Sequence, residues 1–224
     1  MTSCSACTAG YQCKPGSTTP TPTNSECPYG TYCNGAGNVN PTSCPSGEYL
    51  PYRGESTDGN CQDCQAGYYC PKGSWEQFVC PPGHYCGSKV EHPTQCNAGS
   101  WNPTYYATAQ GDCDPCPAGY YCKAGTTSPI KCPAGWICEL NSIDYTTAKC
   151  GAGTYSGGES IGSSGDCKTC PMGHYCPIDS ADATSISVFP IPCPAGTFSS
   201  ATGNTQASDC QECSSGRVCP YLGN

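Results

Sequence analysis

Apolar residues occur along this chain in short pieces rather than in long periodic runs. Pieces rich in Tyr, Thr, Val and Trp are separated by turn signals such as Asn34-Gly35, Asp58-Gly59 and Gly157-Gly158. No ten-residue stretch shows a clean apolar period of 3.6 without Gly or Pro, so the pattern nearly excludes helix. We expect short β-ribbons and turns, stacked into an elongated rod in which each repeat touches mainly its neighbours.

The composition indicates what holds such pieces together. Of the 224 residues, 28 are Gly, 25 are Cys and 22 are Pro, whereas charged residues make up only 12%. Large aliphatic residues are too sparse for a continuous core, so covalent crosslinks must take its place. The fold class is therefore one of small disulfide-rich repeats, and this cysteine content indicates an oxidising, extracellular compartment.

Charge and hydropathy limit the partners. The formal net charge is −8 and no basic stripe is present, which argues against nucleic acid. No run is long enough to span a membrane, and Met1 to Cys13 lack the basic flank and apolar stretch of a secretory signal. Because the cysteines require secretion, we expect that a signal was removed or that this chain is a segment of a longer precursor.

One motif, C-x-x-G-x-(aromatic or apolar), organises the whole chain. Its glycine is present in every copy, which suggests a turn with positive φ or a close backbone approach. The residue two positions after this glycine is aromatic in nine copies. The twelve motifs begin at Cys7, Cys27, Cys44, Cys64, Cys80, Cys96, Cys116, Cys132, Cys150, Cys170, Cys193 and Cys213.

The motifs are of two kinds, which differ in where the next cysteine lies. In four long motifs it lies seventeen positions on, which predicts the pairs Cys44–Cys61, Cys96–Cys113, Cys150–Cys167 and Cys193–Cys210. In eight short motifs it lies six positions on. The fourth repeat lacks one short motif. If each short motif closes on its own second cysteine, this loss leaves no cysteine without a partner, so we favour local closure. Crosslinks between two short motifs are the alternative. Local closure gives Cys7–Cys13, Cys27–Cys33, Cys64–Cys70, Cys80–Cys86, Cys116–Cys122, Cys132–Cys138, Cys170–Cys176 and Cys213–Cys219.

The order of short and long motifs divides the chain into four repeats and a stub. Cys4 falls in the slot of the second cysteine of a long motif, but its expected partner would precede residue 1. We therefore expect Cys4 to be unpaired or to bond to another molecule. The expected repeats are 1–63, truncated at its start, 64–115, 116–169 and a shortened 170–212, followed by a stub at 213–224.

The long motifs with their following cysteine carry a family resemblance. The stretch Cys193-Pro-Ala-Gly-Thr-Phe through Cys210-Gln-Glu-Cys213 resembles an ephrin-receptor-like cysteine-rich repeat. The same pattern recurs from Cys44 to Cys64, from Cys96 to Cys116 and from Cys150 to Cys170, so the resemblance covers essentially the whole chain. The chain is also similar, less closely, to tumour-necrosis-factor-receptor modules.

This resemblance implies a different pairing and a setting. It implies that the four cysteines after a long pair are crossed, so that Cys64 would bond Cys80 and Cys70 would bond Cys86. Tandem arrays of such motifs also resemble protist surface proteins, including ciliate surface antigens and the filamentous hairs of flagella. The resemblance thus implies an extracellular scaffold, with no catalytic residues to carry over.

Metal-binding and catalytic interpretations are weaker than structural ones. Five C-x-x-C knuckles have the spacing of zinc sites, but the cysteine parity closes without metal. Of the three histidines, His84 and His174 recur in register, which favours structure over catalysis, and we expect neither an enzyme nor a cofactor. A carboxylate precedes three of the knuckles, and capping a turn is a simpler account of it than calcium binding. These acids are Asp112, Asp166 and Asp209.

Some side chains are candidates for surface contacts or modification. Tyrosines in the motif are expected to cover its disulfide, whereas those outside that slot are better interface candidates. They are Tyr52, Tyr105, Tyr106 and Tyr145. The segment from Ser17 to Thr23 is low in complexity, and its threonines are candidates for O-linked sugar. They are Thr18, Thr19, Thr21 and Thr23.

Taken together, these features favour a structural subunit of an extracellular filament or cell-surface coat. Copies would assemble head to tail into a homopolymer, with glycans as a further class of partner. The alternative is a ligand-binding ectodomain fragment of a receptor or adhesion protein, which one irregular patch of exposed aromatic and charged residues would indicate. The first long loop is the most charged, with Glu48, Arg53, Glu55 and Asp58.

Overall fold

The computed structural model describes residues 7–14, 16–35, 37, 39–146, 148–158, 160–177, 188–214 and 219. The contacts divide the chain into two units, which we describe separately. The first comprises Met1–Cys96 and Asn102–Asp114, and the second comprises Asn97–Trp101 and Pro115–Asn224. No helix in the described ranges is both long and apolar enough to cross a bilayer.

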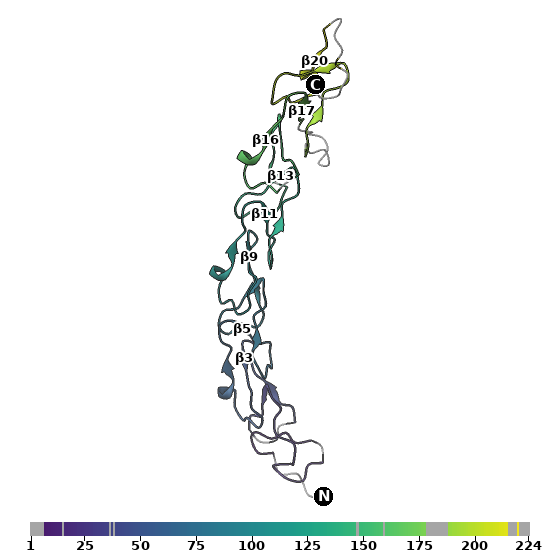
Figure 1. Cartoon of the computed structure of the whole chain (residues 1–224). Coiled ribbons are helices and arrows are strands. Elements are labelled where there is room, and N and C mark those ends of the chain that lie inside the picture. Colours follow the sequence, from purple (N-terminus) through teal and green to yellow (C-terminus); the bar gives the residue numbers. More distant parts are fainter. Residues whose placement is uncertain are drawn as a thin grey trace. The chain divides into compact units, whose positions relative to one another are not determined.

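Two-residue strands are the regular elements of both units, and Figure 1 shows them distributed along the trace instead of gathered into one sheet. In the first unit β1 (Thr31–Tyr32) pairs with β2 (Thr42–Ser43), β3 (Glu48–Tyr49) with β4 (Gln62–Asp63), β5 (Tyr68–Tyr69) with β6 (Phe78–Val79), and β7 (His84–Tyr85) with β8 (Thr94–Gln95). In the second unit β11 (Tyr120–Tyr121) pairs with β12 (Ile130–Lys131), β13 (Trp136–Ile137) with β14 (Ala148–Lys149), β15 (Thr154–Tyr155) with β16 (Lys168–Thr169), β17 (His174–Tyr175) with β18 (Ile191–Pro192), and β19 (Thr197–Phe198) with β20 (Gln211–Glu212). All these pairs are antiparallel. Two further strands are β9 (Ser100–Trp101), which belongs to the second unit, and β10 (Asp114–Pro115), whose first residue belongs to the first unit and whose second residue belongs to the second.

Helical structure in the described ranges consists of four single 3₁₀ turns, one in each long motif. They are η1 (Asp58–Asn60), η2 (Gln110–Asp112), η3 (Ser164–Asp166) and η4 (Ala207–Asp209). The prediction of small disulfide-rich repeats built of short ribbons, with almost no helix, is therefore confirmed.

The ribbons are made by the same positions of each motif. Counting the first cysteine as position 0, the first strand takes positions 4 and 5, and the second strand takes the two residues before the next first cysteine. In a short motif this pairs Tyr68 with Val79, and in a long motif it pairs Glu48 with Asp63. The two residues inside a C-x-x-C knuckle are thus a β-strand. Within the described ranges no group of His, Cys, Asp and Glu side chains is arranged to hold a metal ion.

The disulfides close each motif on itself. The crossed pairing that the family resemblance implies, Cys64 with Cys80 and Cys70 with Cys86, is not the pairing in the structure. The physical reason is the turn at the motif glycine, which brings the cysteine at position 6 back to within 6.0 Å of its own first cysteine between Cα atoms at Cys64 and Cys70. The short pairs are Cys7–Cys13, Cys27–Cys33, Cys64–Cys70, Cys80–Cys86, Cys116–Cys122, Cys132–Cys138, Cys170–Cys176 and Cys213–Cys219. The long pairs are Cys44–Cys61, Cys96–Cys113, Cys150–Cys167 and Cys193–Cys210, and Cys4 lies outside the described residues.

This pairing makes a direct chemical prediction. Trypsin cleaves after Lys72 and Lys89, which are both exposed, and the segment between them contains only Cys80 and Cys86. We expect non-reducing digestion of the denatured chain to release residues 73–89 as a single peptide with one internal disulfide. Mass spectrometry would detect it. Crossed pairing would instead keep this peptide bonded to residues 54–72, which contain Cys64 and Cys70.

Cystines form most of the interior. Apart from Leu50, Ala107, Trp136, Ile137 and Ile161, every buried hydrophobic residue in the described ranges is a cysteine. Long motifs have no cysteine at position 6, yet the residue there is still buried: Leu50, Asn102, Ser156 and Ser199. Position 6 is therefore an interior position in both kinds of motif, and a disulfide is one of two ways of filling it.

Successive motifs stack through main-chain hydrogen bonds that repeat in register. In most motifs the glycine donates its N–H to the carbonyl at position 6 of the next motif, as Gly47 does to Cys70 (2.8 Å) and Gly119 does to Cys138 (2.8 Å). Gly135 donates instead to the hydroxyl of Ser156, which is at position 6 of the next motif (2.9 Å). In return, the first cysteine's carbonyl accepts an N–H from position 9 or 10 of the next motif, as Cys64 does from Lys89 (2.9 Å). These bonds cross the expected repeat boundary at 63/64 as they do elsewhere, so the division into four repeats stays a prediction.

The motif glycine is required by both reasons that the sequence suggests. Gly67 has φ +87°, and a Cβ atom there would lie 2.9 Å from the carbonyl oxygen of Tyr106, two motifs further along the chain. At Gly99, with φ +86°, the same atom would lie 2.7 Å from the carbonyl oxygen of Asn141. At these two positions the glycine lets the backbone two motifs away approach closely, which any side chain would prevent.

Candidate functional site

Three side chains from three successive motifs form an exposed aromatic and cationic cluster in the first unit, which we call the Tyr29–Trp75 patch. The rings of Tyr29 and Trp75 are 6.1 Å apart between centroids and tilted by 46°, and the Arg53 guanidinium lies 5.5 Å from the centroid of the Tyr29 ring. Tyr29 is 52% exposed and Trp75 is 50% exposed. Half-exposed aromatic rings beside a cation are typical of binding surfaces.

The backbone next to each residue of the patch is fixed by stacking hydrogen bonds. Gly30, after Tyr29, donates to the carbonyl of Leu50 (3.0 Å), and Gly54, after Arg53, donates to that of Cys27 (3.0 Å). Ser74, before Trp75, is buried, and its carbonyl accepts from the Leu50 N–H (2.9 Å). The patch is therefore presented by rigid backbone, although its members lie far apart in the sequence.

The sequence interpretation missed Tyr29 and Trp75, but a signal for Tyr29 is present. The residue before the motif glycine is Ala, Ser or Pro in ten motifs, and only Tyr29 and Met172 depart from this. A small residue suits this position because it faces the backbone two motifs on: the Ala118 Cβ would lie 2.9 Å from a Cβ atom at Gly162. Tyr29 is thus a large residue at a position where the stacking of motifs favours a small one.

The interface candidates from the sequence divide into exposed and interior residues. Tyr52, Tyr105 and Tyr106 are 59%, 60% and 52% exposed. Tyr106 also packs edge-on against Tyr68, with ring centroids 5.4 Å apart. Tyr145 is instead half-buried, and its ring packs against Tyr121 and Trp136 in the second unit at 5.4 and 5.6 Å between centroids.

The charges of the first long loop do not converge on one patch. Lys89 pairs with Asp63 (2.7 Å) and Glu48 (3.5 Å), and its hydrogen bond to Asp63 is the main cause that raises its pKa. Glu55 accepts a hydrogen bond from Asn60 inside the loop, whereas Arg53 faces Tyr29. Asp58 begins η1 and is exposed.

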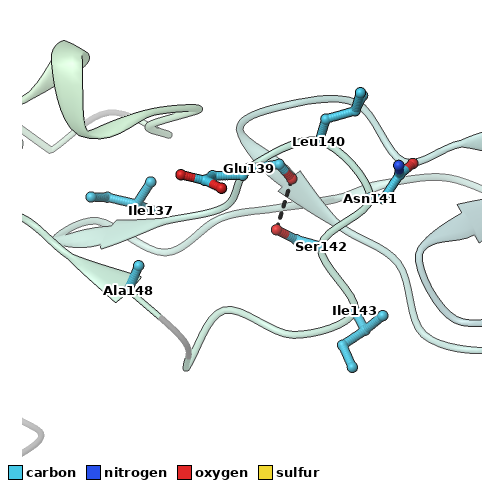
Figure 2. A pocket seen from close by; sticks show the side chains of 7 residues that line it. All are labelled: Ile137, Glu139, Leu140, Asn141, Ser142, Ile143 and Ala148. Atoms are coloured by element: carbon cyan, nitrogen blue, oxygen red, sulfur yellow. Dashed lines mark hydrogen bonds between the residues drawn. The ribbon is translucent and has the colours of Figure 1, made fainter.

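Two surface hollows offer little chemistry of their own. Figure 2 shows the one in the second unit, of about 530 Å³, where the Ser142 hydroxyl donates to the main-chain carbonyl of Glu139 (2.7 Å) beside the side chains of Leu140 and Ile143. Neither lining includes a histidine or cysteine. The other, of about 320 Å³, lies on the first long loop and is lined by Tyr52, Glu55, Gly59, Asn60 and Gln62.

His84 and His174, which occupy the same position in their motifs, make the same local contact with a main-chain carbonyl. His84 Nδ1 lies 3.1 Å from the carbonyl of Pro82, and His174 Nδ1 lies 3.0 Å from that of Met172. Each is part of a ribbon strand, β7 or β17. This equivalence supports the structural interpretation of the pair. The candidate sugar acceptors Thr18, Thr19, Thr21 and Thr23 are all exposed.

The acids before the knuckles cap turns, as the simpler account predicted. Asp112 Oδ2 accepts from the Thr108 N–H (2.6 Å), the Thr108 hydroxyl and the Ala109 N–H. Asp209 Oδ2 accepts from the Thr205 N–H (2.7 Å), the Thr205 hydroxyl and the Gln206 N–H. The same pattern occurs at Asp166 with Ser163. The backbone bond from Thr108 or Thr205 is the main cause that lowers the pKa of Asp112 and Asp209.

This capping predicts a pH-dependent loop. Because the pKa of Asp209 in the folded chain lies below its ordinary value of 3.8, the contribution of the cap is complete above that value and is lost as pH falls through the folded pKa. In an NMR titration the Thr205 and Gln206 amide protons should shift below pH 3.8, and Asp209→Asn should remove the transition. Glu212→Gln on β20 is the control and should leave it unchanged. A transition at or above pH 3.8 would contradict the cap.

The chain matches no protein-family model and no curated protein sequence.

Proposed function

We propose that this protein is a structural subunit of an extracellular filament or cell-surface coat, whose copies assemble head to tail. The observation that carries the proposal is the repetition of the stacking hydrogen bonds. Most motifs offer the next a glycine N–H and a cysteine carbonyl, and the next motif answers with the carbonyl of position 6 and an N–H. The motif of Cys132 makes the corresponding bonds with the hydroxyls of Ser156 and Ser160. Such faces are complementary from one motif to the next, so stacking has no built-in limit and suits an open polymer.

The crosslinking supports the same proposal. Twelve disulfides indicate an oxidising compartment, and secretion to the cell surface is the setting we propose for it. Because each motif is closed by its own bond, a pulling force along the chain would meet a covalent restraint in every motif. This property suits a load-bearing coat.

The test is assembly of the oxidised chain. We expect sedimentation and negative-stain microscopy to show linear polymers that grow with concentration. Gly196 is the exposed member of the motif glycines in the described ranges and has no described atom within 4 Å of an added Cβ, so it is the place to block stacking. Gly196→Asn should fold and assemble poorly, because Asn tolerates its φ of +84° but would obstruct an incoming backbone.

The matched control is Gly35→Asn. Gly35 has φ +77° and likewise no described atom within 4 Å of an added Cβ, but it is not a motif glycine, so this variant should assemble normally. A chain that stays monomeric at every concentration would refute head-to-tail assembly.

A ligand-binding ectodomain is the second candidate, and the Tyr29–Trp75 patch favours it. The patch has the exposed aromatic and charged residues expected of a binding hot spot. A monomeric chain that binds a ligand through this patch would move the second candidate ahead of the first.

A further inference from the structure

We propose that the Tyr29–Trp75 patch binds an acidic sugar, with the pyranose ring stacked on the aromatic rings and its carboxylate held by Arg53. The inference goes beyond assembly into a filament and holds whether or not the chain polymerises. It joins three features of the patch: open ring faces, an unpaired cation and a small area.

The ring faces are available because the motif stacking cannot bury them. A Cβ atom at Gly30 would overlap the Gly73 carbonyl, so the backbones beside Tyr29 and Trp75 are already in close contact. With no further space between those backbones, the two rings project outward and stay half exposed. A half-exposed Trp and Tyr at positions fixed by the backbone lose little conformational freedom when a ligand stacks on them.

Arg53 supplies a charge that the described residues leave unpaired. No carboxylate pairs with its guanidinium in the described part of the chain, whereas Lys89 in the same unit has two acidic partners. Its contact with the Tyr29 ring holds the guanidinium in place without using up its N–H donors. A planar fork of donors beside an aromatic face suits a carboxylate.

The size of the patch selects the class of ligand. A buried Tyr or Trp covers roughly 150 to 250 Å², so two half-exposed rings offer about 200 Å². A stable protein interface needs about 800 Å² from each partner, which the patch does not approach. One or two sugar rings match it. A uronic acid has C–H groups on one face for stacking and a carboxylate at its edge for Arg53.

Binding is tested with a trimer of galacturonic acid against a neutral trimer of galactose. Of the three tryptophans, Trp75 is half exposed, Trp101 is partly buried and Trp136 is buried, so a fluorescence change that is lost in Trp75→Ala reports the patch. Calorimetry gives affinities for the variants. We expect the acidic trimer to bind about tenfold more tightly than the neutral one, the scale of one charge-assisted hydrogen bond.

Variants separate the two contributions. Tyr29→Ala restores the small residue found in other motifs, so it should fold, and it should weaken both trimers about tenfold, as should Trp75→Ala. Arg53→Gln should weaken only the acidic trimer and so abolish the preference. Tyr52→Ala is the control, since Tyr52 is a similarly exposed tyrosine.

Three results would overturn the proposal. They are the absence of binding to either trimer, affinity that is unchanged in Trp75→Ala, and tighter binding of a tetraglutamate peptide than of the acidic sugar. The last result would assign the patch to an acidic peptide instead. None of them depends on polymerisation, so failure here is distinct from failure of the assembly proposal.

Discussion

Replacing Gly47 by Ala is expected to destabilise the first unit by about 2 to 5 kcal/mol. Two costs add. A side chain at φ +82° costs roughly 1 to 2 kcal/mol. The new Cβ would also overlap the carbonyl oxygen of Lys89, and relieving an overlap of this kind costs roughly 1 to 3 kcal/mol more. Because the obstacle is backbone held by the bond from Lys89 N–H to Cys64, a rotamer change cannot relieve it.

The chain contains controls that separate these two costs. Gly35 has φ +77° and no described atom within 4 Å of an added Cβ, so Gly35→Ala should show the conformational cost alone. Gly119 is a motif glycine with φ +84°, but its nearest described neighbours would be 3.7 Å away, so Gly119→Ala should resemble Gly35→Ala. Denaturant unfolding of the oxidised proteins gives the comparison. Equal losses at Gly47 and Gly35 would show that close approach between motifs does not stabilise the fold.

The local fold was predictable because its cause is local. A fixed spacing of cysteines, an unvarying glycine and turn residues between short apolar pieces determine where a motif turns back on itself, as Cys64 to Cys70 illustrates. The two explanations of the glycine from sequence, positive φ and close approach, are both realised at Gly67. Family resemblance was the poorer guide to pairing, since it implied crosslinks between motifs whose own turns already bring their cysteines together.

The surface was less predictable because its contacts join motifs that are not adjacent. The partner of Gly67 is Tyr106, 39 positions on, and the partner of Tyr29 is Trp75, 46 positions on. No spacing rule within a motif reveals these pairs. Tyr145 shows a second difficulty. Outside the aromatic slot it has no sign of burial, yet the ring of Trp136 in its own motif and that of Tyr121 in the preceding motif pack against it. Only departures from the repeat, such as Tyr29 beside a motif glycine, mark such sites in advance.

Removing a short disulfide with serine is expected to cost more than removing a long one, against the order of loop lengths. Chain entropy alone assigns about 3 kcal/mol to Cys44–Cys61, with separation 17, and about 2 kcal/mol to Cys64–Cys70, with separation 6. However, Cys64 and Cys70 are both fully buried, whereas Cys61 is only half-buried. A serine pair at the short site therefore buries one more hydroxyl, at about 1 to 3 kcal/mol.

Alanine pairs at the same two sites provide the matched control. Alanine buries no polar group. At the short site the variant loses the burial of one more sulfur, about 1 kcal/mol, and this loss offsets the smaller loop-entropy contribution of the short disulfide. The two alanine variants should therefore unfold at similar denaturant concentrations, and only the serine variants should differ, with Cys64/Cys70 the less stable. Unfolding without reductant, followed by tyrosine and tryptophan fluorescence, measures all four. The opposite result would be that the Cys44/Cys61 variant is less stable than the Cys64/Cys70 variant with serine and also with alanine. Loop entropy would then outweigh burial, and the cystines would act as tethers and not as the core of the fold.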